Sequence, residues 1–171
     1  MLEEWIPKDI KTLTRDEALA KLAIIYVTGH GPVTAQDLSM RSSLSVGECK
    51  KALSMIEDKV ETMTIDKTVY YYVSPKKAAA KSSTLLLAAF DEYFLGYKDR
   101  SPIADIAHHK KIYSVNGIFS PTITVDGYVV GIWKRTVKKD TVMIELNILD
   151  TSRKVDMKAI EKDAQRFTDF L

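Results

Sequence analysis

The sequence has few of the residues that form disulfides or metal sites. It contains one cysteine, Cys49, and three histidines in 171 residues. One cysteine excludes a disulfide within the chain, and a structural zinc site needs about four ligands. The glycine-rich phosphate loop and the G-x-S-x-G motif of many hydrolases are also absent. We therefore expect no metal ion and no other cofactor, and the scarcity of cysteine favours a cytoplasmic protein.

Long apolar runs are missing too. The longest candidate, residues 84–90, has the length of a strand, whereas a helix needs about 18 apolar residues to cross a bilayer. The N-terminus lacks the basic start and apolar core of a signal peptide. Apolar residues nevertheless make up 46% of the chain, so we expect a globular protein without a membrane partner.

The net charge of +2 is too small to identify a partner, but the charge is unevenly distributed. Residues 1–74 carry 9 Lys/Arg and 11 Asp/Glu, and residues 75–171 carry 16 and 12. A nucleic-acid-binding protein usually has a basic face. Only the second part of the chain is basic in its totals.

The first part contains three capping-box patterns, at 14–17, 34–37 and 45–48. In each, Thr or Ser precedes an acidic residue by three positions, which is typical of a helix N-terminus. The first predicted helix ends at the Gly29–Pro32 segment, and the second ends near residues 41–43. The third, Ser45–Glu57, has Cys49, Leu53 and Ile56 on its apolar face.

Two strands are predicted next, at 60–65 and 69–73, joined by a turn at 66–68. Three helices followed by a hairpin are typical of a winged helix, in which a helix-turn-helix is closed by a β-hairpin wing. We assign residues 1–74 to this domain. The small, polar and basic segment 75–83 is interpreted as a linker.

The remaining residues, 84–171, predict a second domain. Strands are expected at 84–89, 118–125, 128–135 and 141–149, with Asp126-Gly127 as a hairpin turn and another turn at 138–140. A C-terminal helix follows Asp156. The fold class is therefore α+β: a winged helix followed by a small antiparallel sheet or barrel closed by a C-terminal helix. Periodicity does not assign residues 90–100 to a helix or a strand.

Several ordered blocks of the sequence resemble one bacterial family. They are the segment Tyr26–Leu44 with its HGPVT at 30–34, residues 85–100 (LLLAAFDEYFLGYKDR), Phe119–Thr122 (FSPT), Val125–Gly127 (VDG) and Val129–Arg135 (VVGIWKR). In these blocks the chain is similar to winged-helix DNA-binding domain proteins related to AlkZ-type (YcaQ-like) DNA glycosylases.

The resemblance implies a function in DNA repair. Family members are typically longer, with tandem winged helices before a β-barrel-like domain, and this chain resembles their C-terminal half. Their catalytic motif is Gln (or His)–apolar–Gln. The glutamines here, Gln36 and Gln165, each lack a second glutamine two positions away. No catalytic residue is therefore transferred, and we expect a non-catalytic portion or a short relative of the family.

Candidate DNA-binding residues come from three elements: the N-terminal half of the third helix, the tip of the wing and the basic run near the second hairpin. A recognition helix reads the major groove with its N-terminal side chains, and lysines neutralise phosphates. The candidates are Ser45, Gly47, Lys50, Lys51, Lys67, Lys134, Arg135, Lys138 and Lys139. The competing interpretations are a helix used as a packing scaffold and a solvated lysine turn that protects a sheet edge.

The expected partner is double-stranded DNA. The alternatives are a protein-interaction or structural module, including a homodimeric one, and, less favoured, a complete DNA glycosylase. Asp91, Glu92, Asp99 and Arg100 offer carboxylates for acid–base chemistry, but a buried structural ion pair at Asp99 or Arg100 is the favoured use.

Overall fold

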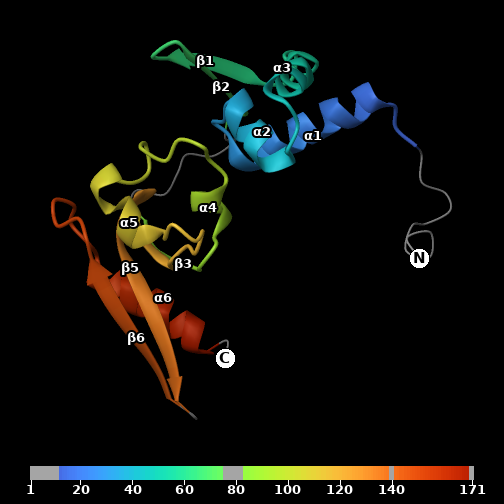
Figure 1. Ribbon diagram of the computed structural model, residues 1–171. Helices are drawn as coiled ribbons and strands as arrows, with labels where there is room; N and C mark the ends of the chain where they lie inside the picture. The colour runs from blue at the N-terminus through green and yellow to red at the C-terminus, as the bar shows by residue number, and fades with distance from the viewer. Residues whose placement is uncertain (1–11, 75–82, 139–140, 170–171) are drawn as a thin grey trace. The chain divides into compact units, whose positions relative to one another are not determined.

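The structure is a computed structural model that describes residues 12–74, 83–138 and 141–169. The chain divides into two compact units, Met1–Pro75 and Lys76–Leu171 (Figure 1). Within the described residues, no helix is both long enough and apolar enough to span a bilayer. The predicted 75–83 linker lies almost entirely outside the described residues.

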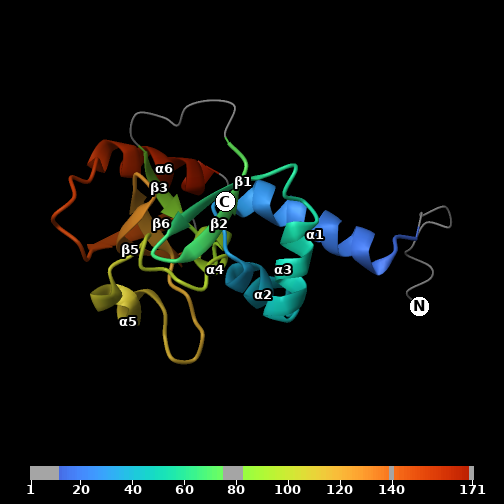
Figure 2. The same cartoon turned by 90° about the horizontal axis from the view of Figure 1, so that it is seen from above.

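The first unit consists of three helices followed by a two-stranded antiparallel hairpin. The elements are α1 (Arg15–His30), α2 (Ala35–Ser42), α3 (Val46–Ser54), β1 (Glu61–Ile65) and β2 (Thr68–Tyr72). This is the element order that the sequence predicts for a winged helix, and Figure 2 shows the three helices from a second direction.

All three predicted capping boxes are present. The hydroxyls of Thr14, Thr34 and Ser45 each accept the backbone N–H three residues on, and the acidic side chain there accepts the N–H of the cap. The second box is buried, with Thr34 N donating to Asp37 Oδ2 at 2.7 Å. Each box satisfies N–H groups that a helix start otherwise leaves without a partner. The helix starts are thus determined locally.

The core of this unit joins all three helices. The fully buried side chains include Val27 and Leu38, Cys49 and Leu53 of α3, and Ile56 just after it. Val33, between α1 and α2, forms two backbone hydrogen bonds with Tyr71 of β2, at 2.9 and 2.8 Å. The hairpin is therefore attached to the helices by backbone pairing as well as by side-chain packing.

The hairpin turns on two residues, Asp66 and Lys67, with φ of 47° and 67°. Two consecutive positive φ values match the right-handed twist of the strands and give a tight turn. Thr68, which was expected to lie in the turn, already pairs with Ile65.

The second unit is built on a four-stranded antiparallel sheet with the order β3-β4-β5-β6. Its elements are β3 (Thr84–Leu87), α4 (Glu92–Leu95), η2 (Ile106–His108), α5 (His109–Ile112), β4 (Thr122–Val125), β5 (Tyr128–Lys138), β6 (Thr141–Ile148) and α6 (Met157–Asp169). Of the two forms that the sequence left open, the described strands make the open sheet, because β3 and β6 are its two edges.

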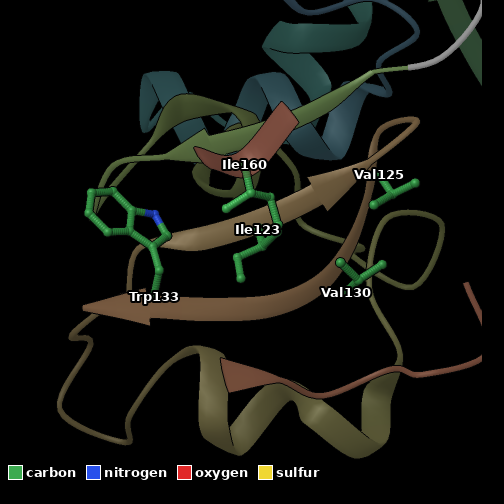
Figure 3. Packing of buried hydrophobic residues seen from close by; sticks show 5 residues of the cluster. All are labelled: Ile123, Val125, Val130, Trp133 and Ile160. Carbon is green, nitrogen blue, oxygen red and sulfur yellow. The ribbon is translucent and has the colours of Figure 1, made fainter. Parts of the chain in front are cut away.

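Apolar clusters cover both faces of the sheet. The first contains Ile123, Val125, Val130 and Trp133 of the sheet with Ile160 of α6 (Figure 3). The second packs strand residue Val129 and buried Ala104 against Phe94 of α4 and Ile112 of α5. The C-terminal helix therefore closes one face, as predicted, and the segment between β3 and β4 covers the other.

Other stretches also differ from the predicted elements. The third helix, predicted to run to Glu57, ends at Ser54. The ambiguous segment 90–100 contains the short helix α4, whose N-cap is Asp91; its carboxylate accepts the N–H of Tyr93 at 2.8 Å. The strand expected from residue 118 begins only at Thr122. Pro121 precedes it and has no N–H to donate to the ladder, so strand pairing starts after the proline.

Candidate nucleic-acid interface

The exposed side of α3 carries the residues expected to face DNA. Gly47, Lys50, Lys51 and the N-cap residue Ser45 are all exposed, while Cys49 is buried. This division follows from the helical period, because the buried residues share one stripe. The Ser45 hydroxyl is already used, since it hydrogen-bonds the carboxylate of Glu48 at 2.8 Å and accepts the Glu48 N–H at 3.2 Å.

Two ion pairs join α3 to the first turn of α1. Lys51 Nζ lies 2.7 Å from Asp16 Oδ1, and the Arg15 guanidinium pairs with the Glu48 carboxylate. The Ser45 hydroxyl, followed by the Arg15 guanidinium, holds the pKa of Glu48 below its usual value. The charge of Lys51 is thus offset by a carboxylate, whereas the ammonium of Lys50 takes part in no ion pair in the described part of the chain.

The wing tip presents Lys67 to solvent beside the equally exposed Asp66. Both belong to the tight turn described above, and their opposite charges adjoin. Lys67 and the α3 lysines belong to the same unit and are all accessible. The local charge at the wing tip is close to neutral, so its electrostatic attraction for a polyanion is weak.

The basic run predicted near the second hairpin lies on β5. Lys134 and Arg135 are both exposed, and successive side chains of a strand point to opposite faces, so the two cations are divided between the faces. Lys134 pairs in register with Glu145 of β6, and Lys138 pairs with Thr141. Lys139 lies outside the described residues. Lys134 and Arg135 therefore do not meet at one point of the surface.

An arginine-centred aromatic cluster was not predicted from the sequence. The guanidinium carbon of Arg100 lies 5.2, 5.7 and 5.5 Å from the ring centroids of Phe94, Tyr113 and Phe119. Arg100 Nε also donates to the Phe94 carbonyl at 2.8 Å. Cation–π contacts of this kind stabilise a fold. The four residues are spread between positions 94 and 119, so no local pattern reveals the cluster.

The acidic residues of the same segment have local structural uses. Asp91 caps α4, and Asp99 Oδ1 accepts the N–H of Ser101 at 2.9 Å. The Ser101 N–H holds the pKa of Asp99 below its usual range. Arg100 binds the aromatic cluster described above. Asp91, Asp99 and Arg100 thus form local hydrogen bonds and ring contacts within this segment.

The Cys49 thiol and the potential metal ligands form no reactive site in the described residues. Burial raises the pKa of the Cys49 thiol, which is fully shielded, as its position on the apolar face of α3 predicts. No group of three or more potential metal ligands occurs within residues 12–74, 83–138 and 141–169.

Comparison with known proteins identifies the family. A family model described as DNA glycosylase AlkZ-like matches residues 1–170. The chain belongs to the AlkZ-like DNA glycosylase family. This confirms the resemblance that the sequence blocks suggested.

The chain is also similar to a curated protein and to a solved structure. The chain is 27% identical over 159 residues to an interstrand DNA cross-link repair glycosylase of Streptomyces sahachiroi, covering 87% of this chain and 42% of the relative. It is also similar to the structure of the Streptomyces sahachiroi DNA glycosylase AlkZ, with a TM-score of 0.72 and 24% identity, over 91% of this chain and 43% of that one. The structural likeness supports the α+β fold. The chain spans less than half the length of either AlkZ-like protein.

Proposed function

We propose that this chain is a cytoplasmic, DNA-binding, non-catalytic portion or short relative of the AlkZ-like DNA glycosylases, and that its partner is double-stranded DNA. The observation that carries the proposal is the family match over residues 1–170. The three-helix unit with its hairpin supplies an exposed helix of the type that enters a major groove. Lys50 and Lys67 of that unit, with Lys134, Arg135, Lys138 and Lys139 of the second, are the proposed phosphate contacts.

The proposal limits what α3 can read. Its exposed face has no arginine or asparagine for bidentate contacts with a base edge. Lys51 is engaged by Asp16, so Lys50 is its main free cation. We therefore assign to α3 backbone contacts that position the duplex, and no sequence preference.

The test is duplex binding measured by fluorescence anisotropy over a series of salt concentrations. The binding constant should fall steeply with salt, with a slope of about 0.9 on a log–log scale for each phosphate neutralised. Replacing Lys50 and Lys67 with Gln should lower that slope, as should replacing Lys134, Arg135, Lys138 and Lys139. The matched control is the double change Lys158→Gln and Lys162→Gln, which removes two exposed cations of α6.

The absence of any duplex binding at low salt contradicts the proposal, as does binding that none of the site variants changes.

The proposal that the chain is non-catalytic has a separate test, in which the chain is incubated with an alkylated duplex and released bases are measured. We expect no release, because neither Gln36 nor Gln165 has a second glutamine two positions away. Release of a base by the isolated chain overturns this part.

A second candidate function is a protein-interaction module. It is favoured by one observation, the pairing of two α3 charges with α1, which leaves that helix nearly neutral. A homodimer that covers Lys50 and Lys51 is its specific form. Sedimentation velocity distinguishes the two functions. A dimer that dissociates on the change Lys50→Glu supports the protein-interaction module over DNA binding. A dimer that persists after this change argues against the protein-interaction module.

A further inference from the structure

A tight turn between α5 and β4 has an apolar residue at its tip. Gly117 N donates to Ser114 O at 3.0 Å, and Ser114 N donates to Ile118 O at 2.9 Å. The Ser114 hydroxyl also accepts the Ile118 N–H at 3.2 Å. Ser at the first position and Gly at the fourth are common choices in such turns. The turn is thus fixed by its own hydrogen bonds.

The base of the turn is held by the arginine-centred aromatic cluster. Tyr113 and Phe119 form a β-bridge at the base of the turn, and their rings stack with centroids 5.4 Å apart and planes inclined by 25°. The guanidinium of Arg100 lies over both rings of the turn. Because the stem is packed on both flanks, the tip is presented in one preorganised position.

Val115 is fully exposed at this tip, with a relative exposure of 105%, and Ile118 is 59% exposed. Turn tips usually carry Gly, Pro, Asn, Asp or Ser, each of which stabilises the turn by a backbone effect. A valine supplies none of these effects, and its side chain is in water. Its presence here favours an intermolecular use.

The charge around the turn indicates the partner. The segment 106–125 contains no acidic residue, although the chain has 23. In this segment α5 exposes Lys110 and Lys111 shortly before the turn. An apolar tip whose own segment, from residue 106 to 125, carries cations and no carboxylate is complementary to a duplex, whose phosphates flank a stack of apolar base faces.

We propose that the 114–117 turn inserts Val115 between adjacent base pairs of duplex DNA, while Lys110 and Lys111 contact the neighbouring phosphates. This rests on the duplex binding proposed above and names the element that would deform the duplex. Apolar wedges of this kind partially unstack a base step, and the cost is offset by additional protein contact. Unstacking costs least at a mismatched step, so the wedge should favour such sites.

The experiment uses the full chain and two duplexes, one fully paired and one with a central mismatch, each carrying 2-aminopurine beside the central step. Binding of the unmodified chain should raise 2-aminopurine fluorescence, and the mismatched duplex should bind more tightly. Val115→Ser should remove the fluorescence rise and weaken binding to the mismatched duplex by about tenfold, the effect of withdrawing one valine side chain from an apolar contact. Serine is compatible with the turn, and circular dichroism verifies folding.

Matched controls separate the wedge from general binding. Met157→Gln removes another exposed apolar side chain, at the start of α6, and should leave both signals unchanged. Replacing Lys110 and Lys111 with Gln should lower the slope of the salt dependence by about 2. The α6 pair Lys158→Gln and Lys162→Gln should not.

The possible failures are distinguishable. If no duplex binds, the proposed function fails. If duplexes bind but Val115→Ser changes neither the 2-aminopurine signal nor the preference for the mismatch, the wedge is refuted and duplex binding stands. Val115-dependent sedimentation with anionic phospholipid vesicles, without an effect on DNA, also overturns the wedge and assigns the turn to a lipid surface.

Discussion

Asp16 in the first turn of α1 faces Lys51 of α3, with Oδ1 and Nζ 2.7 Å apart, and the neighbouring residue Arg15 pairs with Glu48. Both side chains of the Asp16–Lys51 pair are more than half exposed. Exposed pairs contribute little to stability because water screens them. These ion pairs have a larger effect on the electrostatic potential at the surface of α3, which a polyanion would experience.

Asp16→Asn should therefore raise duplex affinity severalfold at low salt with little change in stability. The change leaves Lys51 free to neutralise a phosphate and removes a carboxylate from the surface. Anisotropy titrations measure the affinity, and urea unfolding measures the stability. Glu161→Gln on the exposed side of α6 alters the net charge equally. An equal gain from Glu161→Gln would assign the effect to net charge rather than to α3.

The capping boxes make the first unit sensitive to acid. The Ser45 hydroxyl and the Arg15 guanidinium lower the pKa of Glu48, and the Thr14 N–H and hydroxyl lower the pKa of Glu17, in each case from an ordinary value of 4.5. Groups whose pKa is lower in the folded state contribute stability above their unfolded pKa. They lose it as the pH falls through the folded pKa.

Urea unfolding should show the stability of this unit falling as the pH is lowered below about 4.5. Glu48→Gln should reduce that dependence, because it removes one of the titrating caps. Glu57→Gln, an exposed change just beyond α3, should leave the profile as it is. A pH profile that Glu48→Gln does not alter contradicts a stabilising contribution from this box.

A pair of glycines at the end of α1 offers a matched comparison. A Cβ added at Gly31 would lie 2.6 Å from the Val27 carbonyl oxygen and 3.1 Å from the Tyr72 Cα, whereas one at Gly29 would meet nothing within 4 Å. Gly31→Ala should destabilise by about 1–3 kcal/mol through overpacking. Gly29→Ala, inside the helix, should stabilise by about 0.5–1 kcal/mol. The unfolding temperatures of the two variants should thus shift in opposite directions. An unfolding temperature that Gly31→Ala does not lower would show that the contact with Val27 and Tyr72 has room for a Cβ.

The attachment of α6 depends on one buried side chain. Ile160 is 1% exposed and packs on Ile123 and Trp133 of the sheet (Figure 3). Ile160→Ala should destabilise the second unit by about 2–5 kcal/mol, because it leaves a cavity and loses apolar burial. Glu161→Ala, the next residue and exposed, should change it by less than about 0.5 kcal/mol. Denaturant unfolding measures both, and equal effects would argue against packing through Ile160.

The features that the sequence predicted well are those set by neighbouring residues. Each capping box involves residues three positions apart, and the Asp126-Gly127 turn is defined by two residues that both take positive φ, 50° and 80°. The apolar face of α3 follows from the helical period. Local chemistry determines all of these, so they can be read without knowledge of the fold.

The features that could not be predicted from the sequence depend on residues far apart in the chain. Arg15 and Glu48 are 33 positions apart, and Lys51 and Asp16 are 35 apart, so no local pattern shows that these α3 charges pair with α1. The arginine-centred aromatic cluster likewise draws on separate elements. The late start of β4 reflects Pro121 and the Tyr113–Phe119 bridge, which takes up residues that alternation alone would place in a strand.

The strand order also has a kinetic consequence. Strands β4, β5 and β6 are joined by tight hairpins, whereas β3 pairs with β4 only after the chain has passed from residue 84 to residue 125. Local pairings close quickly, and distant ones carry a larger loop-closure entropy. The three C-terminal strands should therefore assemble first and accept β3 late. The segment between β3 and β4, which carries the arginine-centred aromatic cluster, is closed into a loop by that pairing. We therefore expect this cluster to form in the last step of folding of the second unit.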